Sequence, residues 1–272
     1  MKKTKWCFLG IILLAVWGCG KQEEKDSSTR VAADIKSGNM ILIPAGEFWM
    51  GSLAGEGGSD EHPRHRVSLG AFYIDKHEVR TEDYRACLTA GKCPDPVNTS
   101  APTCNLGMFG VFDKKGYPMN CLQWDEAKAY CEWAGKRLPT EAEWEKAARG
   151  GTETRWSFGD NEGELGNFAW YRSATSEGQE TRPVGLKKPN QYGMYDMYGN
   201  VAEWVADKYS ENYYTSSPIN DPRGPDSERN ESFVLRGGAW IDDAEGTRSA
   251  ARASCLLANP DNNYHYGFRC AI

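Results

Sequence analysis

The chain lacks the sequence features of several common functional classes. It contains no cluster of basic residues and carries a net charge of −6, so nucleic acid is not an expected partner. It has neither a Gly-x-Ser-x-Gly segment nor a Gly-rich phosphate loop followed by Lys, which argues against serine hydrolases and P-loop nucleotide binding. Closely spaced pairs of Cys-x-x-Cys motifs are also missing, so a structural zinc site is not favoured.

The composition itself is that of a globular protein. Hydrophobic residues make up 40% of the 272 residues and charged residues 26%. This length suffices for one large domain or two small ones. No internal repeat of fixed period is visible, so a solenoid or a propeller is not expected.

The N-terminus has the pattern of an export signal. Three lysines, at positions 2, 3 and 5, precede an apolar run from Phe8 to Trp17 that is too short to span a membrane comfortably. The run ends in Val-Trp-Gly-Cys at Cys19, which resembles a bacterial lipobox. That resemblance implies a signal peptide over 1–18, a lipid on Cys19 and a membrane as partner. The alternative is an ordinary secretory signal with a chance cysteine.

The residues after Cys19 predict where the anchored protein resides. Gly20 is not the aspartate that retains lipoproteins at the inner membrane, so we expect the outer membrane, on its periplasmic or its surface face. The stretch up to Gly38 is polar, charged and poor in large apolar residues. It therefore predicts a flexible tether over 19–38, with a folded domain over 39–272.

The predicted location determines which cysteines are available for disulfides. Of nine cysteines, Cys7 leaves with the signal and Cys19 is lipidated, so seven remain in an oxidising compartment where disulfides are the default. Seven is odd, so at least one thiol stays unpaired or pairs with another chain. The pairing among Cys87, Cys93, Cys104 and Cys121 is open; a Cys104–Cys121 bridge closing the irregular insertion is the favoured choice.

Local patterns predict short strands and three helices. Residues 40–43 and 47–50 are expected to form a β-hairpin, with further strands at 66–74, 232–237, 249–254 and 266–271. Helices are expected from Thr81, as N-cap, to Leu88 and from Trp124 to Ala134. In a third helix, Thr140 and Glu143 form a capping box, and Gly150 follows the last residue.

Four long blocks resemble the formylglycine-generating (sulfatase-modifying factor) family. They are Met-Ile-Leu-Ile-Pro-Ala-Gly-Glu-Phe-Trp-Met-Gly from Met40, Ala-Gly-Lys-Arg-Leu-Pro-Thr-Glu-Ala-Glu-Trp-Glu from Ala134, Tyr-Gly-Met-Tyr-Asp-Met-Tyr-Gly-Asn-Val-Ala-Glu-Trp from Tyr192, and the C-terminal segment from Val234. The last contains Arg-Gly-Gly-Ala-Trp at 236–240, Ser-Ala-Ala-Arg at 249–252 and Gly-Phe-Arg-Cys at 267–270. The match extends over nearly the whole domain.

The resemblance implies a fold and two stabilising features. The fold is a single α+β domain, related to C-type lectins, with little regular secondary structure. A disulfide between Cys131 and Cys270 is expected, worth about 3–5 kcal/mol in the chain-entropy model. A structural calcium ion is expected on Asp196, Gly199, Val201 and Glu203, with a second, weaker site at Asn167 and Phe168.

The catalytic feature of the family is missing. Family enzymes oxidise a client cysteine with copper held by two cysteines between the Gly-Gly and Ala-Ala-Arg blocks. Here that interval, residues 239–248, contains no cysteine and carries Ile241, Asp242, Asp243 and Ala244 instead. Copper(I) requires soft thiolates, which carboxylates do not replace, so copper is not expected.

Three functional hypotheses follow. The favoured one is a non-catalytic, membrane-anchored binding or scaffold lipoprotein of the bacterial envelope, with another envelope protein or a surface ligand as partner. The second is an enzyme of altered chemistry, an oxidoreductase or a maturation factor for an exported protein. The least favoured is a copper-dependent formylglycine-generating oxidase. A ligand cleft is expected at Trp240, Asp242, Asp243, Arg248 and Arg252.

Overall fold

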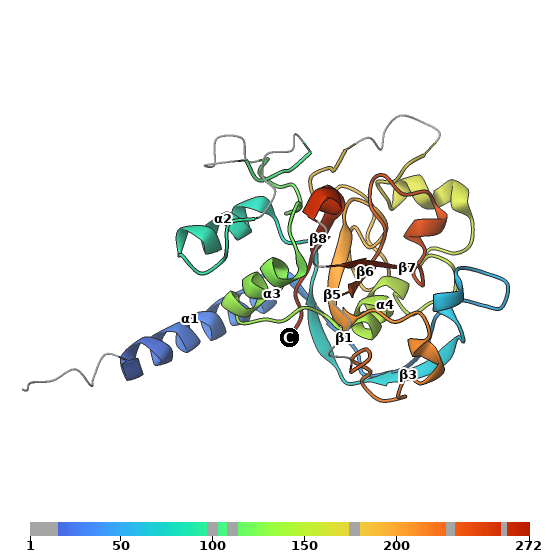
Figure 1. Ribbon diagram of the computed structural model, residues 1–272, viewed down its shortest axis with the longest axis horizontal. Coiled ribbons are helices and arrows are strands. Elements are labelled where there is room, and N and C mark those ends of the chain that lie inside the picture. The colour runs from blue at the N-terminus through green and yellow to red at the C-terminus, as the bar shows by residue number, and fades with distance from the viewer. Residues whose placement is uncertain (1–15, 97–102, 108–113, 174–179, 227–231, 257–259) are drawn as a thin grey trace, which may run out of the picture.

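The structure is a computed structural model that describes residues 16–96, 103–107, 114–173, 180–226, 232–256 and 260–272, with side chains described outside 16–25 and 260–262. Three small sheets and short helices form its body (Figure 1). Long irregular segments connect them, which confirms the α+β class with little regular secondary structure.

The N-terminal strands form two separate two-stranded sheets. β1 (Met40–Ile43) pairs antiparallel with β4 (Phe72–Asp75), and β2 (Gly46–Met50) pairs antiparallel with β3 (His65–Leu69). The predicted hairpin between the first two strands is therefore wrong. Pro44, which has no N–H for a ladder, follows β1 directly, and the chain turns away to begin the second sheet.

The C-terminal half supplies a four-stranded sheet in the order β7-β6-β5-β8. Its strands are β5 (Ala202–Lys208), β6 (Ser232–Arg236), β7 (Arg252–Leu256) and β8 (Tyr266–Phe268). β5 pairs parallel with β8, and the other neighbours are antiparallel. All five residues of β6 are buried, as expected for an inner strand covered on both faces.

Three helices of the body match the predicted segments closely. They are α2 (Thr81–Thr89), α3 (Trp124–Trp133) and α4 (Glu141–Arg149). α4 has the predicted capping box at Thr140 and Glu143, and Gly150 follows it in the left-handed conformation. α2 differs at its start, because Arg80 is the N-cap and the Thr81 hydroxyl instead donates to the Lys114 carbonyl.

Single turns of 3-10 helix occur in the loops. They include η1 (Ser59–Glu61), η3 (Glu162–Asn167), η5 (Tyr213–Thr215), η6 (Glu245–Thr247) and η7 (Pro260–His265).

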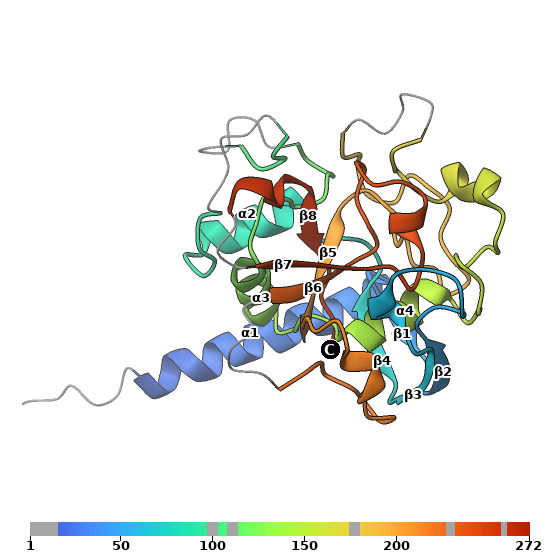
Figure 2. The ribbon, with the colours of Figure 1, turned by 45° about the vertical axis from the view of Figure 1, so that its right-hand side comes forward.

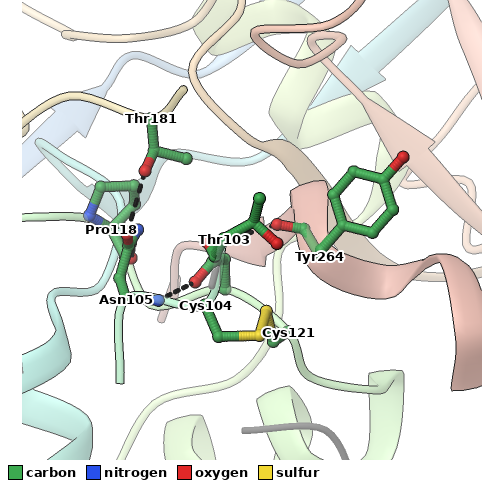
Figure 3. Close-up of a disulfide and its surroundings, with 8 residues drawn as sticks. Thr103, Cys104, Asn105, Pro118, Cys121, Thr181 and Tyr264 are labelled. Carbon is green, nitrogen blue, oxygen red and sulfur yellow. Dashed lines mark hydrogen bonds between the residues drawn. A yellow bond between two sulfur atoms is a disulfide. The ribbon is translucent and has the colours of Figure 1, made fainter. Parts of the chain in front are cut away.

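Three disulfides hold the irregular parts. Cys131–Cys270 and Cys104–Cys121 are present as expected, and Cys87–Cys93 is the third. Cys255 is the free cysteine among the described residues, in agreement with the odd count. Figure 3 shows the Cys104–Cys121 bridge beside Asn105, whose backbone N–H donates to the Asn120 side chain.

The segment predicted as a flexible tether is helical. α1 (Val16–Ser37) extends away from the body in both views (Figures 1 and 2). Ser27, Arg30, Val31, Asp34 and Ile35 are half-buried, at the i, i+3, i+4, i+7, i+8 spacing of one helix face.

Specific contacts explain why α1 is ordered against the body. The Arg30 guanidinium lies 4.4 Å from the Trp133 ring centroid and donates to the Trp133 carbonyl at 2.8 Å. Asp34 lies 2.6 Å from the Lys136 ammonium group. Composition alone cannot reveal such contacts, because their partners lie about a hundred residues away. Within the described chain no helix is long and apolar enough to cross a membrane.

Candidate functional site

The loop of residues 239–246, where the resemblance predicts the copper-binding position of family enzymes, uses its own carboxylates to hold its shape. The Asp242 carboxylate accepts the Ala239 N–H at 2.8 Å, and the Asp243 carboxylate accepts the Gly246 N–H at 3.1 Å. Ala244 is buried and Ile241 packs against the core. The polar side chains of this loop thus act as turn braces, a common role of Asp in irregular backbone.

The two arginines of the predicted cleft point into the body. Both terminal nitrogens of Arg248 donate hydrogen bonds to the Glu61 carboxylate, each at 2.8 Å. Arg252 donates two hydrogen bonds to the Glu141 carboxylate, at 2.7 and 3.0 Å, and the Arg252 side chain is fully buried. Bidentate pairs of this kind fix geometry strongly. The structure therefore separates the five predicted cleft residues into two buried arginines and a surface group.

The surface group consists of Trp240, Asp242 and Asp243, and its Trp240 lies near η7. The backbone N–H of Trp240 donates to the Asn200 carbonyl at 3.1 Å, and the Trp240 ring centroid lies 6.5 Å from that of Tyr264. The Tyr264 carbonyl accepts the Asn120 amide at 2.6 Å, beside the Cys104–Cys121 bridge (Figure 3). The disulfide-bonded insertion thus supports η7, which lies next to Trp240.

The first predicted calcium set lies in the interior, and one of its oxygens has no partner. Asp196 is 3% exposed; its Oδ2 accepts the Gly185 N–H at 2.6 Å, whereas its Oδ1 is buried without a hydrogen bond. Burial raises the pKa of this carboxyl to about 6. A buried carboxylate oxygen without a donor fits an oxygen-seeking cation.

Glu203 is already occupied by protein donors. Arg269 donates to both of its oxygens, at 2.7 and 2.6 Å, and the Trp144 indole donates to one of them at 2.8 Å. Gly199 and Val201, predicted to ligate through backbone carbonyls, lie between Asp196 and Glu203 in the chain. No three His, Cys, Asp or Glu side chains among the described residues gather closely enough to form a metal-binding cluster by themselves. Backbone oxygens would have to complete the coordination.

Sequence reasoning missed Glu78 as a member of this region. Its side chain is 2% exposed and accepts the Asn200 amide at 2.7 Å. Burial, with the nearby charges of Asp196 and Glu203, raises its pKa well above the usual value. The only signal was its position in the Glu-Val-Arg-Thr block, which carries no hint of a partner 118 to 125 residues away.

The second calcium set lies beside two lysine side chains. The Asn167 amide donates to Glu164 at 2.8 Å, and the Asn167 carbonyl accepts the Lys188 N–H at 2.9 Å. The Lys187 ammonium group donates to the Gly166 carbonyl at 2.6 Å, and the Lys188 ammonium group lies 5.8 Å from the Phe168 ring centroid. Positive charge at this position opposes a divalent cation.

Fold and site together define a formylglycine-generating-type α+β domain with an acidic loop at residues 239–246. Accordingly, the chain belongs to the family of sulfatase-modifying factor enzyme 1-like domains, whose model matches residues 25–272. It is 33% identical to a formylglycine-generating enzyme of Streptomyces coelicolor, over 85% of this chain and 88% of the relative. It is 31% identical to an inactive C-alpha-formylglycine-generating enzyme 2 of Bos taurus, over 86% and 87%.

Other relatives place the same domain in different settings. A serine/threonine-protein kinase pkn1 of Chlamydia pneumoniae is 37% identical over 85% of this chain, but the match spans only 37% of that protein. Among solved structures, PvdO from Pseudomonas aeruginosa is 31% identical with a TM-score of 0.73, over 85% of this chain and 93% of PvdO. Treponema denticola variable protein 1 is 30% identical with a TM-score of 0.68, over 85% and 94%. Relatives of similar identity therefore include enzymes and proteins described as inactive.

Proposed function

We propose that this protein is a non-catalytic, lipid-anchored binding or scaffold protein of the bacterial envelope that lacks the copper chemistry of the enzymes in its family. The observation that carries the proposal is the use of Asp242 and Asp243 as backbone braces. In the loop where family enzymes hold copper, this chain offers no thiolate, and the acidic groups that replace the cysteines serve the loop itself.

The two arginines support the same conclusion. An acidic enzyme site would need polar groups that converge on a substrate. Arg248 and Arg252 are instead neutralised by Glu61 and Glu141 inside the body. The surface that remains at Trp240 suits contact with a partner.

A mass-spectrometric oxidation assay tests the absence of the family activity. The protein is loaded with Cu(I) and incubated in air with a cysteine-containing sulfatase peptide, beside the Streptomyces coelicolor enzyme as positive control. The expected result is no formylglycine product. Turnover above the copper-only blank would overturn the proposal.

The anchor is tested separately by labelling cells with an alkyne fatty acid. Labelling is expected for the wild type and is expected to disappear in Cys19→Ala. Replacing the half-buried free cysteine Cys255 by Ala serves as control and should leave labelling unchanged. An unlabelled wild type recovered from the soluble fraction would contradict lipid anchoring.

In-cell crosslinking then tests the binding role. A specific envelope partner should be captured by the wild type, and capture should fall when Trp240 is replaced by Ala. If no crosslinked species forms, or if capture is insensitive to the Trp240 surface, the scaffold role at this surface is wrong.

Calcium is the cofactor that we propose, as a structural ion. Asp196 would bind it through the unpartnered carboxylate oxygen, with the backbone carbonyls of Gly199 and Val201. Glu203, held by Arg269, would contribute charge from beside the site. The ion would offset the buried negative charge and cross-link an irregular segment of the chain.

A further inference from the structure

A cavity of about 500 Å³ lies away from the acidic loop and shares no residue with it. Its wall is formed by the β3–β4 turn, the outer side of α3, the connection from α3 to α4, and residues 221–223. This volume falls in the range of small-molecule sites, about 300–1,000 Å³. Neither the calcium set nor the predicted cleft contributes to it.

The inner wall of the cavity is apolar. Leu69, Phe72 and Leu138 line it and are each at most 5% exposed. Trp124 adds an indole whose orientation is fixed, because its Nε1 donates to the Val205 carbonyl at 2.7 Å and its ring stacks on Phe233 with centroids 3.9 Å apart. A ligand would meet a surface that needs little reorganisation, which lowers the entropic cost of binding.

The rim is charged, and most of its charges are paired. Arg137 binds Glu143 through two nitrogens at 2.6 and 2.7 Å, and Lys128 is paired with Glu132. The Asp221 carboxylate accepts the Gly70 N–H at 3.1 Å.

Among the described residues of this rim, Arg223 is the cation that has no carboxylate partner. Its side chain is exposed, and no hydrogen bond or ion pair is recorded for it with any part of the chain that the structure describes. One cation without a partner beside an apolar cavity is complementary to a molecule with an apolar body and one acidic group.

We propose that this cavity binds a small amphipathic carboxylate. The aryl or branched aliphatic body lies against Trp124, Phe72 and Leu138, and the carboxylate pairs with the Arg223 guanidinium. The site is independent of lipid anchoring and of the acidic loop, so it adds a ligand function to the proposed scaffold role.

Calorimetric titration with 2-naphthylacetate tests the site, and its neutral amide, 2-naphthylacetamide, serves as the comparison ligand. The acid is expected to bind with 1:1 stoichiometry and about tenfold more tightly than the amide, as for one charge-assisted pair. Absence of saturable binding up to the solubility limit of the probe, or equal affinity for acid and amide, would overturn the proposal.

Two matched pairs of variants locate the binding. Arg223→Met should reduce the affinity for the acid to that for the amide, whereas Lys115→Met, at an exposed lysine outside the cavity, should change neither. Ala71→Trp, at an exposed position on the cavity wall, should abolish binding of both probes, whereas Ala90→Trp on the exposed end of α2 should not. Thermal unfolding confirms that each variant is folded. Binding that survives Ala71→Trp in a folded protein would show that the probe occupies another surface.

Discussion

This domain contains two clusters of buried charged side chains, which differ in how their charges are paired. The arginine network consists of Glu141, Glu145, Arg149, Arg236 and Arg252, around α4 and β6. The acidic cluster consists of Glu78, Asp196, Glu203 and Arg269. Three arginines face two carboxylates in the first, and three carboxylates face one arginine in the second. The first cluster therefore has more arginines than carboxyl groups, whereas the second has more carboxyl groups than arginines.

The pKa of Glu145 in the first cluster shifts in the opposite direction to the pKa values of Asp196 and Glu78 in the second. Burial pushes the pKa of Glu145 up, but Arg149 and Arg236 outweigh burial and lower it below the usual value. In the acidic cluster burial dominates and raises the pKa of Asp196 to about 6. The comparison teaches that burial alone does not mark a functional carboxylate; the balance of neighbouring charge does.

The largest effect is expected from breaking the arginine network. Arg236→Met should lower the free energy of unfolding by about 3–5 kcal/mol, because Glu145 keeps its burial and loses one of its two arginines. Urea denaturation measures this loss. Arg172→Met, at an exposed arginine, is the control and should change stability little. A loss below about 1 kcal/mol for Arg236→Met would mean that the network is not a unit.

Calcium should act on the acidic cluster. At a free calcium concentration of 100 times its Kd, stability should rise by about 2.7 kcal/mol. Thermal unfolding with calcium and with a chelator measures the difference. Asp196→Asn should remove the response, while Glu164→Gln beside the second, cation-rich set should retain it. A calcium response that persists in Asp196→Asn places the ion elsewhere.

The pH dependence of the stability of Asp196→Asn, measured in the absence of calcium, sharpens the comparison. The pKa of Asp196 is raised in the folded state, so the folded protein binds a proton more readily between about pH 4 and 6, and ionisation above that range costs stability. Asp196→Asn should therefore be more stable than the wild type at pH 7, and the difference should shrink as pH falls toward 4.

The pH dependence of wild-type stability alone does not isolate the contribution of Asp196. Burial lowers the pKa of His77 to about 4, so protonation of the unfolded state reduces stability as pH falls below about 6.5. The difference between wild type and Asp196→Asn, measured by urea denaturation in chelator, separates the two groups. A difference that is constant with pH would show that Asp196 is not held at a raised pKa.

The smallest effect is expected in the acidic loop. Asp243 accepts the Gly246 N–H at an exposed position where water can replace it, and it lies 3.7 Å from an exposed arginine, so Asp243→Ala should change stability by less than about 0.5 kcal/mol. Asp242→Ala removes the acceptor for the Ala239 N–H and should cost about 1 kcal/mol. Urea denaturation compares the two. Equal losses would argue that Asp242 does not brace the loop.

Local signals in the sequence predicted local structure well. The capping box of α4 was predictable because Thr140 and Glu143 satisfy each other within one turn. The Cys131–Cys270 bridge and the fold class followed from the family resemblance, since no spacing rule joins two cysteines 139 residues apart.

Long-range pairing was not predictable from the same signals. The pairing of β1 with β4 rather than with β2 depends on two sheets that form together, and the residues of each strand suit either partner. The same holds for Arg248 and Arg252, whose carboxylate partners lie 187 and 111 residues earlier. A charged side chain near a candidate site gives no sign in the sequence of which way it points.

The docked helix α1 changes what an anchor at Cys19 would do. A flexible tether lets every face of a domain meet the membrane in turn. A helix held by Arg30 and Asp34 removes that rotational freedom. Because the contacts of α1 with the body begin at Ser27, the stretch from Cys19 to Ser27 would hold the body roughly 12 Å from the lipid at 1.5 Å per residue. With the orientation set by α1, the same side of the domain would always face away from the bilayer, so partners would be selected by height and direction as well as by chemistry.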